Sequence, residues 1–259
     1  PLGYGVTSVA EGMTQAQGLG FPLLVRPSYV IGGLGMEIVY DNASLERYLQ
    51  GAFEREPKSS VLIDQYINGL EVEVDAISDG ENVIIPGIME HLERAGVHSG
   101  DSISIYPAPS ISSRMKGQII VTTRKIAQAL KIVGLLNIQF IVDKDKLYVI
   151  EVNPRASRTV PFLSKVTGVP MIELSTRCML GETVNSMDYP TGLYPERELF
   201  AVKHPVFSME KIPAADSALG PEMKSTGEVL CMDAKLEHAL YKGFVAASGT
   251  LRGLSAKGT

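Results

Sequence analysis

Residues 139–158, QFIVDKDKLYVIEVNPRASR, contain the side chains best placed to do chemistry. Apolar and polar residues alternate there, which predicts two short strands joined by a charged turn. If the turn has three residues, Gln139 lies opposite Glu151, and Asn153 follows two residues later on the same face. A turn of four residues would place Gln139 opposite Ile150 instead.

Two arginines, Arg155 and Arg158, follow this hairpin directly. Amide and carboxylate oxygens next to guanidinium groups are suited to a magnesium–phosphate complex. A polar residue on a hairpin face is more often simply solvated. Because five such residues meet at one predicted corner, we favour a binding site there.

The composition indicates a soluble globular protein. Its 259 residues allow one large domain or two small ones, with 45% hydrophobic and 20% charged residues. The net charge of −5 gives no sign of a nucleic acid or an anionic membrane as partner. No apolar run approaches the roughly 20 residues of a membrane-spanning helix. Cys178 and Cys231 are far apart, so we expect reduced thiols and a cytoplasmic protein.

The first third of the chain predicts alternating strands and helices. Helices are expected at 7–19 and 43–55, and strands at 21–26, 36–40, 60–67, 70–77 and 82–89. A glycine-rich loop at 27–35 separates the first two strands, and such a tip either closes over phosphates or is an ordinary mobile loop. Asn68-Gly69 is typical of a hairpin turn.

Three carboxylates share one face of the strand at 70–77, namely Glu71, Glu73 and Asp75. They either solubilise that face or accept hydrogen bonds from a ribose. Residues 91–112 predict a long loop with a short extended piece, and loops of this length are often functional.

The remainder predicts a clear amphipathic helix after Ser112, then the hairpin described above. Helices at 159–167 and 171–180 follow, then strands at 198–207 and 227–232 and a helix at 234–247. The mixture of helices with hairpin-connected strands predicts the α+β class.

This order of elements resembles an ATP-grasp domain. The phrases FPLLVRPSYVIGG, GIMEHLERAGVHSGDS, NIQF, VIEVNPRASRTVPFLSKVTGVP and GPEMKSTGEV are similar to the carbamoyl phosphate synthetase large-subunit family, from about Gly20 to Ala247. RTVPFLSK and GPEMKSTGEV resemble the second, carbamate-phosphorylating half. Since the chain starts with Pro1 and lacks the half's N-terminal α/β subdomain, we expect a piece of a longer polypeptide.

The resemblance implies a set of site residues. Nucleotide contacts are implied at Arg26, Gln65, Ile67, Glu71, Gly96, Val97, His98, Ser99, Gln139 and Glu151. Two Mg²⁺ or Mn²⁺ ions are implied at Gln139, Glu151 and Asn153. Arg155 and Arg158 are implied as catalytic residues that hold the carboxylate-type substrate and the transferring phosphoryl group.

The resemblance also implies an organisation and a function. Residues 1–90 are expected to form a small lid subdomain, 91–200 the large subdomain with the metal site, and 201–259 its strand–helix extension. The expected reaction is phosphorylation of carbamate by ATP, with the rest of the large subunit and a glutaminase small subunit as partners. The alternatives are a bicarbonate-phosphorylating ligase of the same fold and a nucleotide-binding module without turnover.

Overall fold

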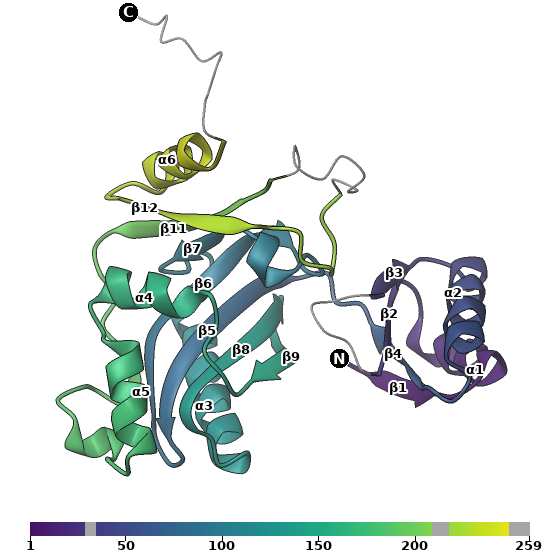
Figure 1. Cartoon of the computed structure of the whole chain (residues 1–259), viewed down its shortest axis with the longest axis horizontal. Coiled ribbons are helices and arrows are strands. Elements are labelled where there is room, and N and C mark those ends of the chain that lie inside the picture. Colours follow the sequence, from purple (N-terminus) through teal and green to yellow (C-terminus); the bar gives the residue numbers. More distant parts are fainter. Residues whose placement is uncertain (29–34, 209–217, 249–259) are drawn as a thin grey trace, which may run out of the picture.

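Two β-sheets organise the chain in the computed structural model, which describes residues 1–28, 35–208 and 218–248 (Figure 1). The smaller sheet has the order β1-β4-β2-β3, with bounds Gly3–Val6, Val61–Gln65, Leu23–Pro27 and Glu37–Val39. Helices α1 (Val9–Leu19) and α2 (Asn42–Arg55) pack on it around a common apolar core that includes Val25, Leu49 and Ile63. Asp41 and Ser44 form a capping box that starts α2.

The larger sheet has eight strands and occupies most of the remaining chain. Its main order is β12-β11-β7-β6-β5-β8-β9, and β10 pairs with β6. In chain order the bounds are β5 Leu70–Asp79, β6 Val83–Arg94, β7 Ser104–Tyr106, β8 Val133–Asp143, β9 Lys146–Asn153, β10 Gly192–Leu193, β11 Phe200–Val206 and β12 Gly227–Asp233. The expected α+β class agrees with this arrangement.

Helices cover the two faces of the larger sheet differently. Helix α3 (Ser113–Ala129) packs on the face that carries Val72 and Val74. Helices α4 (Thr159–Thr167) and α5 (Met171–Met179) pack on the other face. The remaining helices are η1 (Ser99–Asp101), η2 (Val184–Ser186) and α6 (Leu236–Ser248). Since side chains alternate along a strand, Glu71, Glu73 and Asp75 point away from α3.

The chain changes sheets between Gln65 and Leu70. β4 pairs with β1 and β2 but β5 pairs with β6 and β8, so the hairpin predicted at Asn68-Gly69 is wrong. Gly69 meets a different need, because an added Cβ would lie 2.6 Å from both Ile141 Cγ2 and Val142 O. The turn-like dipeptide thus permits a close approach to β8.

Two further expectations change with this crossing. The predicted lid of residues 1–90 includes β5 and most of β6, but both strands belong to the larger sheet, so a boundary at residue 90 would cut through β6. The predicted loop 91–112 with a short extended piece is confirmed in part. Strand β7 is the extended piece, and it pairs with β6 through His91 and Ser104, but residues 91–94 still belong to β6. Gly32 and Gly33 lie outside the described residues. Within the described ranges, helices long and apolar enough to cross a membrane are absent.

Candidate functional site

The hairpin of β8 and β9 pairs Gln139 with Glu151, which confirms the predicted pairing. The turn is shorter than predicted, since Asp143 pairs with Lys146. Val142 therefore pairs with Leu147. Near the turn this is the register expected for a four-residue turn, which would have placed Gln139 opposite Ile150. A β-bulge between Gln139 and Phe140 then shifts the register by one residue and restores the pair.

Two polar rows cross three strands on the face opposite α3. Gln139 lies between Glu73 on β5 and Glu151 on β9. The neighbouring row places Asn137 between Asp75 and Asn153. Glu73, Asp75 and Asn137 are buried, Gln139 and Asn153 are half-buried, and Glu151 is exposed. The rows are therefore open to a ligand at the β9 end.

The hydrogen bonds orient the amides of these rows. Asn137 Nδ2 donates to Glu73 Oε1 at 2.8 Å and to Asp75 Oδ1 at 3.2 Å. Gln139 Nε2 donates to Ser99 Oγ at 3.0 Å, so its Oε1 points away from Ser99. That oxygen, the Glu151 carboxylate and the Asn153 amide oxygen are hard ligands, and the set fits Mg²⁺ or Mn²⁺.

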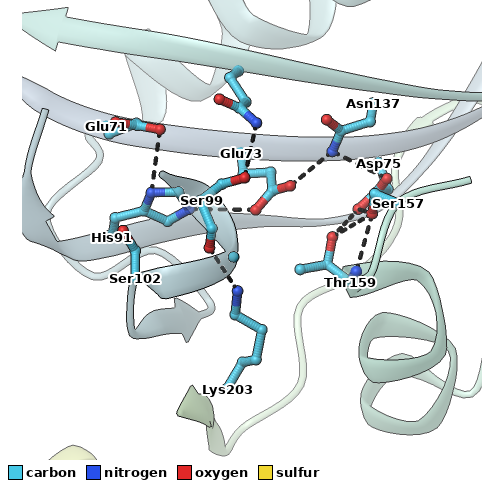
Figure 2. Close-up of polar contacts among 12 residues, drawn as sticks. Glu71, Glu73, Asp75, His91, Ser99, Ser102, Asn137, Ser157, Thr159 and Lys203 are labelled. Atoms are coloured by element: carbon cyan, nitrogen blue, oxygen red, sulfur yellow. Dashed lines mark hydrogen bonds and ion pairs between the residues drawn. The ribbon is translucent and has the colours of Figure 1, made fainter. Parts of the chain in front are cut away.

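Buried charged side chains surround Glu73, at the β5 end of these rows (Figure 2). His91 lies between two carboxylates, with Nδ1 3.4 Å from Glu71 Oε1 and Nε2 3.3 Å from Glu73 Oε2. Burial disfavours the imidazolium, but the two neighbouring carboxylates outweigh it and raise the pKa of His91 to about 9. Burial also opposes the charge on Glu73, yet His91, Lys203 and Asn137 lower its pKa to about 2.

Asp75 behaves in the opposite way. Burial and then the nearby Glu73 charge raise the pKa of Asp75 to about 7, although Thr159, Ser157 and Asn137 donate hydrogen bonds to it. Lys203, which is 1% exposed, donates from Nζ to Ser99 O at 2.9 Å. A buried lysine thus holds the backbone of one of the predicted nucleotide-contacting residues.

These pKa shifts predict that stability falls as the pH rises from 5 to 9. The folded pKa values of His91 (about 9) and Asp75 (about 7) lie above their ordinary values of 6.5 and 3.8. The folded state therefore binds more protons than the unfolded state, between 3.8 and 7 through Asp75 and between 6.5 and 9 through His91. Denaturant midpoints at pH 5, 7 and 9 should decrease in that order. A midpoint that rises with pH would contradict the assigned directions.

The loop after β6 lies against the link between the two sheets. Ile67, Ala95 and Ile141 pack in one cluster, and Tyr66 Oη donates to Ala95 O at 2.6 Å. Gly96 has a φ of +94°, and an added Cβ would lie 3.2 Å from the Tyr66 ring. The structure thus brings the predicted contacts Ile67 and Gly96–Ser99 to one place.

His98 lies in the same region. Its Nδ1 accepts a hydrogen bond from Gly100 N at 3.0 Å. Burial lowers the pKa of His98, and the carboxylates of Asp101, Glu151 and Glu71 oppose that shift through their charge. The predicted nucleotide loop and the predicted metal ligand Glu151 are therefore electrostatic neighbours.

Arg155 and Arg158 are exposed beside the end of β9. Arg155 N donates to Asn153 O at 2.8 Å, which folds the chain back at the last predicted metal ligand. Arg158 Nη1 donates to Ser225 Oγ at 3.2 Å. Ser225 is itself held by Asp101, whose Oδ1 accepts from Ser225 N at 2.7 Å. The predicted substrate arginines thus follow directly after Asn153, the last of the predicted metal ligands.

Arg26 and Gln65 lie in the smaller sheet. Arg26 Nε is 3.4 Å from Asp64 Oδ2, and Gln65 pairs with Leu23. Both belong to the unit that precedes the crossing between sheets, so they are separate in the fold from the rows on β5, β8 and β9.

Sequence reasoning missed several residues of this site. Glu73 and Asp75 were recognised only as members of a face of three carboxylates and were given no role in the site. Asn137 gave a usable signal, because it lies two residues from Gln139 on the same strand face.

His91 and Lys203 were missed as well. The partners of His91 lie on the neighbouring strand β5, and the partner of Lys203 is the Ser99 carbonyl oxygen in η1, far away in the sequence.

Comparisons with known proteins identify the family of the chain. Residues 3–187 match the family described as "Carbamoyl-phosphate synthase L chain, ATP binding domain". The carbamoyl phosphate synthase large chain of Clostridium perfringens is 58% identical over 248 residues, which is 96% of this chain and 23% of that protein. The corresponding protein of Clostridium botulinum is 57% identical over 252 residues, covering 97% of this chain and 24% of that protein. The chain thus spans about a quarter of the length of these relatives.

Solved structures show the fold at low sequence identity. A biotin carboxylase complex from Campylobacter jejuni has a TM-score of 0.72 and 19% identity, covering 95% of this chain and 62% of that one. The biotin carboxylase domain of Hydrogenobacter thermophilus 2-oxoglutarate carboxylase has a TM-score of 0.70 and 20% identity, covering 94% and 60%. The expected ATP-grasp fold is confirmed. With its fold and its sequence in agreement, the chain belongs to the family of carbamoyl-phosphate synthase large-chain ATP-binding domains.

Proposed function

We propose that this chain forms the ATP site of a carbamoyl phosphate synthase large chain and phosphorylates carbamate. The observation that carries the proposal is the pair Gln139–Glu151, with Asn153 in the next row and Arg155 and Arg158 directly beyond it. An array of oxygen ligands beside two exposed guanidinium groups suits the transfer of a phosphoryl group to a small anion.

Each part of the site takes a role in that reaction. Gln139, Glu151 and Asn153 would hold two Mg²⁺ or Mn²⁺ ions, which when bound neutralise charge on the nucleotide phosphates. Ile67 and Gln65 would line the adenine pocket, and Glu71 would accept from the ribose. The loop Gly96–Ser99 would contact the nucleotide, and Arg26 would reach its phosphates from the smaller sheet.

The reaction forms one bond and breaks another. A carbamate oxygen attacks the γ-phosphorus of ATP, the bond from that phosphorus to the bridging oxygen breaks, and ADP leaves with the electron pair. Arg155 and Arg158 would hold the carbamate and the transferring group in line, so positioning and charge neutralisation lower the barrier. Shielding from water would protect carbamate from decomposition.

The partners of the chain follow from the same proposal. The remainder of the large chain would supply carbamate from a bicarbonate-phosphorylating half. A glutaminase small subunit would supply ammonia.

The test uses the full-length enzyme and two partial reactions. ATP synthesis from ADP and carbamoyl phosphate reports the reverse of the carbamate step, whereas bicarbonate-dependent ADP formation reports the other half. Gln139→Ala should slow ATP synthesis at least about tenfold, since it removes a metal ligand, and leave bicarbonate-dependent ADP formation within about twofold. The reverse selectivity would assign this chain to bicarbonate and overturn the proposal.

A further inference from the structure

We propose that Asp75 is a positioning residue that sets the geometry of the arginine loop, residues 154–158, through the hydroxyl groups of Ser157 and Thr159. The inference rests on the proposed function, in which Arg155 and Arg158 hold the reacting groups. Asp75 itself contacts neither arginine. It acts through Ser157, which lies between the two arginines in the chain, and through Thr159, which follows Arg158.

The contacts of Asp75 converge on one end of the loop (Figure 2). Asp75 is 0% exposed, and its Oδ2 accepts from Ser157 Oγ at 2.8 Å and also from Thr159 Oγ1. The two hydroxyl oxygens lie 2.7 Å apart, and Ser157 Oγ accepts from Thr159 N at 3.0 Å. One buried carboxylate oxygen therefore holds both residues that flank Arg158.

Little else in the structure fixes the backbone of the arginine loop. Residues 154–156 and Arg158 are exposed, so packing does not fix them. Helix α4 begins after Arg158, which makes no capping hydrogen bond with its side chain. The backbone at the start of α4 is instead fixed from below, by Asp75 through Thr159.

Asp75 also connects the arginine loop to the row that contains Gln139 and Glu151. Its Oδ1 accepts from Asn137 Nδ2, and the same nitrogen donates to Glu73 Oε1. Glu73 lies directly beside Gln139 in the sheet. The arginines and the predicted metal ligands are therefore positioned relative to the same strand, β5. Since a misplacement of about 1 Å can cost about 10²-fold in rate, this connection matters for transfer more than for binding.

The folding of α4 does not depend on these hydroxyls alone. Val160 and Leu163 are buried in the core under α4. Thr167, in the same helix, is buried as well, but its Oγ1 donates to Leu163 O within the helix. Thr167 therefore offers a matched control for the removal of a buried threonine hydroxyl from α4.

The experiment compares Thr159→Val, Thr159→Ser and Thr167→Val in the full-length enzyme, with ATP synthesis from ADP and carbamoyl phosphate as the assay. Thr159→Val keeps the shape and removes the hydroxyl, so kcat should fall about 30- to 100-fold while the KM for MgADP stays within about threefold. Thr159→Ser should remain within about threefold of wild type in kcat, and Thr167→Val should match wild type. Retained kcat in Thr159→Val, or an equal loss in Thr167→Val, would overturn the proposal.

A double-mutant cycle checks that the effect passes through Asp75. Asp75→Asn replaces one carboxylate oxygen by an NH₂ group that faces hydrogen-bond donors, so this variant should lower kcat on its own. Adding Thr159→Val to it should lower kcat by less than about threefold more. Fully multiplicative losses would show that Thr159 acts independently of Asp75. Failure of the proposed function would look different, because Arg158→Ala would then retain ATP synthesis. If Arg158→Ala loses it and Thr159→Val does not, only the positioning role is wrong.

Discussion

Replacing Arg158 by alanine is expected to lower kcat for ATP synthesis from ADP and carbamoyl phosphate by about 10³-fold in the full-length enzyme. An arginine that stabilises charge during phosphoryl transfer is worth about 10³- to 10⁵-fold, and we expect the lower end because Arg155 stays in place. Arg158 is exposed, and its side chain donates a hydrogen bond to Ser225 Oγ, so the fold should survive.

Two further variants make that measurement specific. Arg158→Lys keeps the charge but loses the planar fork of donors, so it should recover less than about a tenth of the lost activity. Arg114→Ala is the matched control, since Arg114 is 72% exposed and pairs with Asp145 at 3.6 Å on the hairpin turn. A wild-type rate in Arg158→Ala, or a comparable loss in Arg114→Ala, would remove Arg158 from the site.

Glu151→Gln is expected to weaken binding of a magnesium complex of a non-hydrolysable ATP analogue by about 100-fold or more. Glu151 is the one carboxylate among the three predicted metal ligands, and its substitution by an amide removes the charge that attracts the cation. Loss of residues that merely support a ligand costs about 10- to 100-fold in metal affinity, so loss of a ligand should cost at least as much. Titration calorimetry of the 259-residue chain measures the effect.

The same titration without magnesium provides the internal control. Wild type and Glu151→Gln should then bind the analogue equally, because the difference between them arises from the metal. Glu237→Gln, an exposed carboxylate in α6, should behave as wild type with magnesium present. Equal affinities of wild type and Glu151→Gln for the magnesium complex would contradict the metal site.

Local patterns predicted the elements of this fold well and their partners less well. The alternation on β8 and β9 placed Gln139 opposite Glu151, yet the assumed turn length was wrong and a bulge compensated for it. Leu147, Val149 and Val152 all pack in the core under α3. Their spacing is two and then three residues, because the bulge adds one residue between Val149 and Val152. The spacing was visible in the sequence, but a strict period of two could not accommodate it.

Long-range pairing explains what could not be predicted. Asn68-Gly69 fits a hairpin locally, whereas its use at a crossing between sheets depends on β8, about seventy residues away. The same holds for Lys203, whose Nζ donates to the Ser99 carbonyl oxygen in η1, about a hundred residues away. The resemblance supplied the site residues as a set, but it did not supply the buried network behind them.

The bulge in β9 also bears on how the chain tolerates insertions. It separates the hairpin tip at Lys144 and Asp145 from the end of the strand that carries Glu151 and Asn153. A one-residue insertion at the tip that removes the bulge would leave the Gln139–Glu151 pair unchanged. The positions of the predicted ligands are therefore set by the Asn153–Arg158 end of the hairpin and not by its tip. In alignments of relatives, differences in length should fall between Asp143 and Ile150.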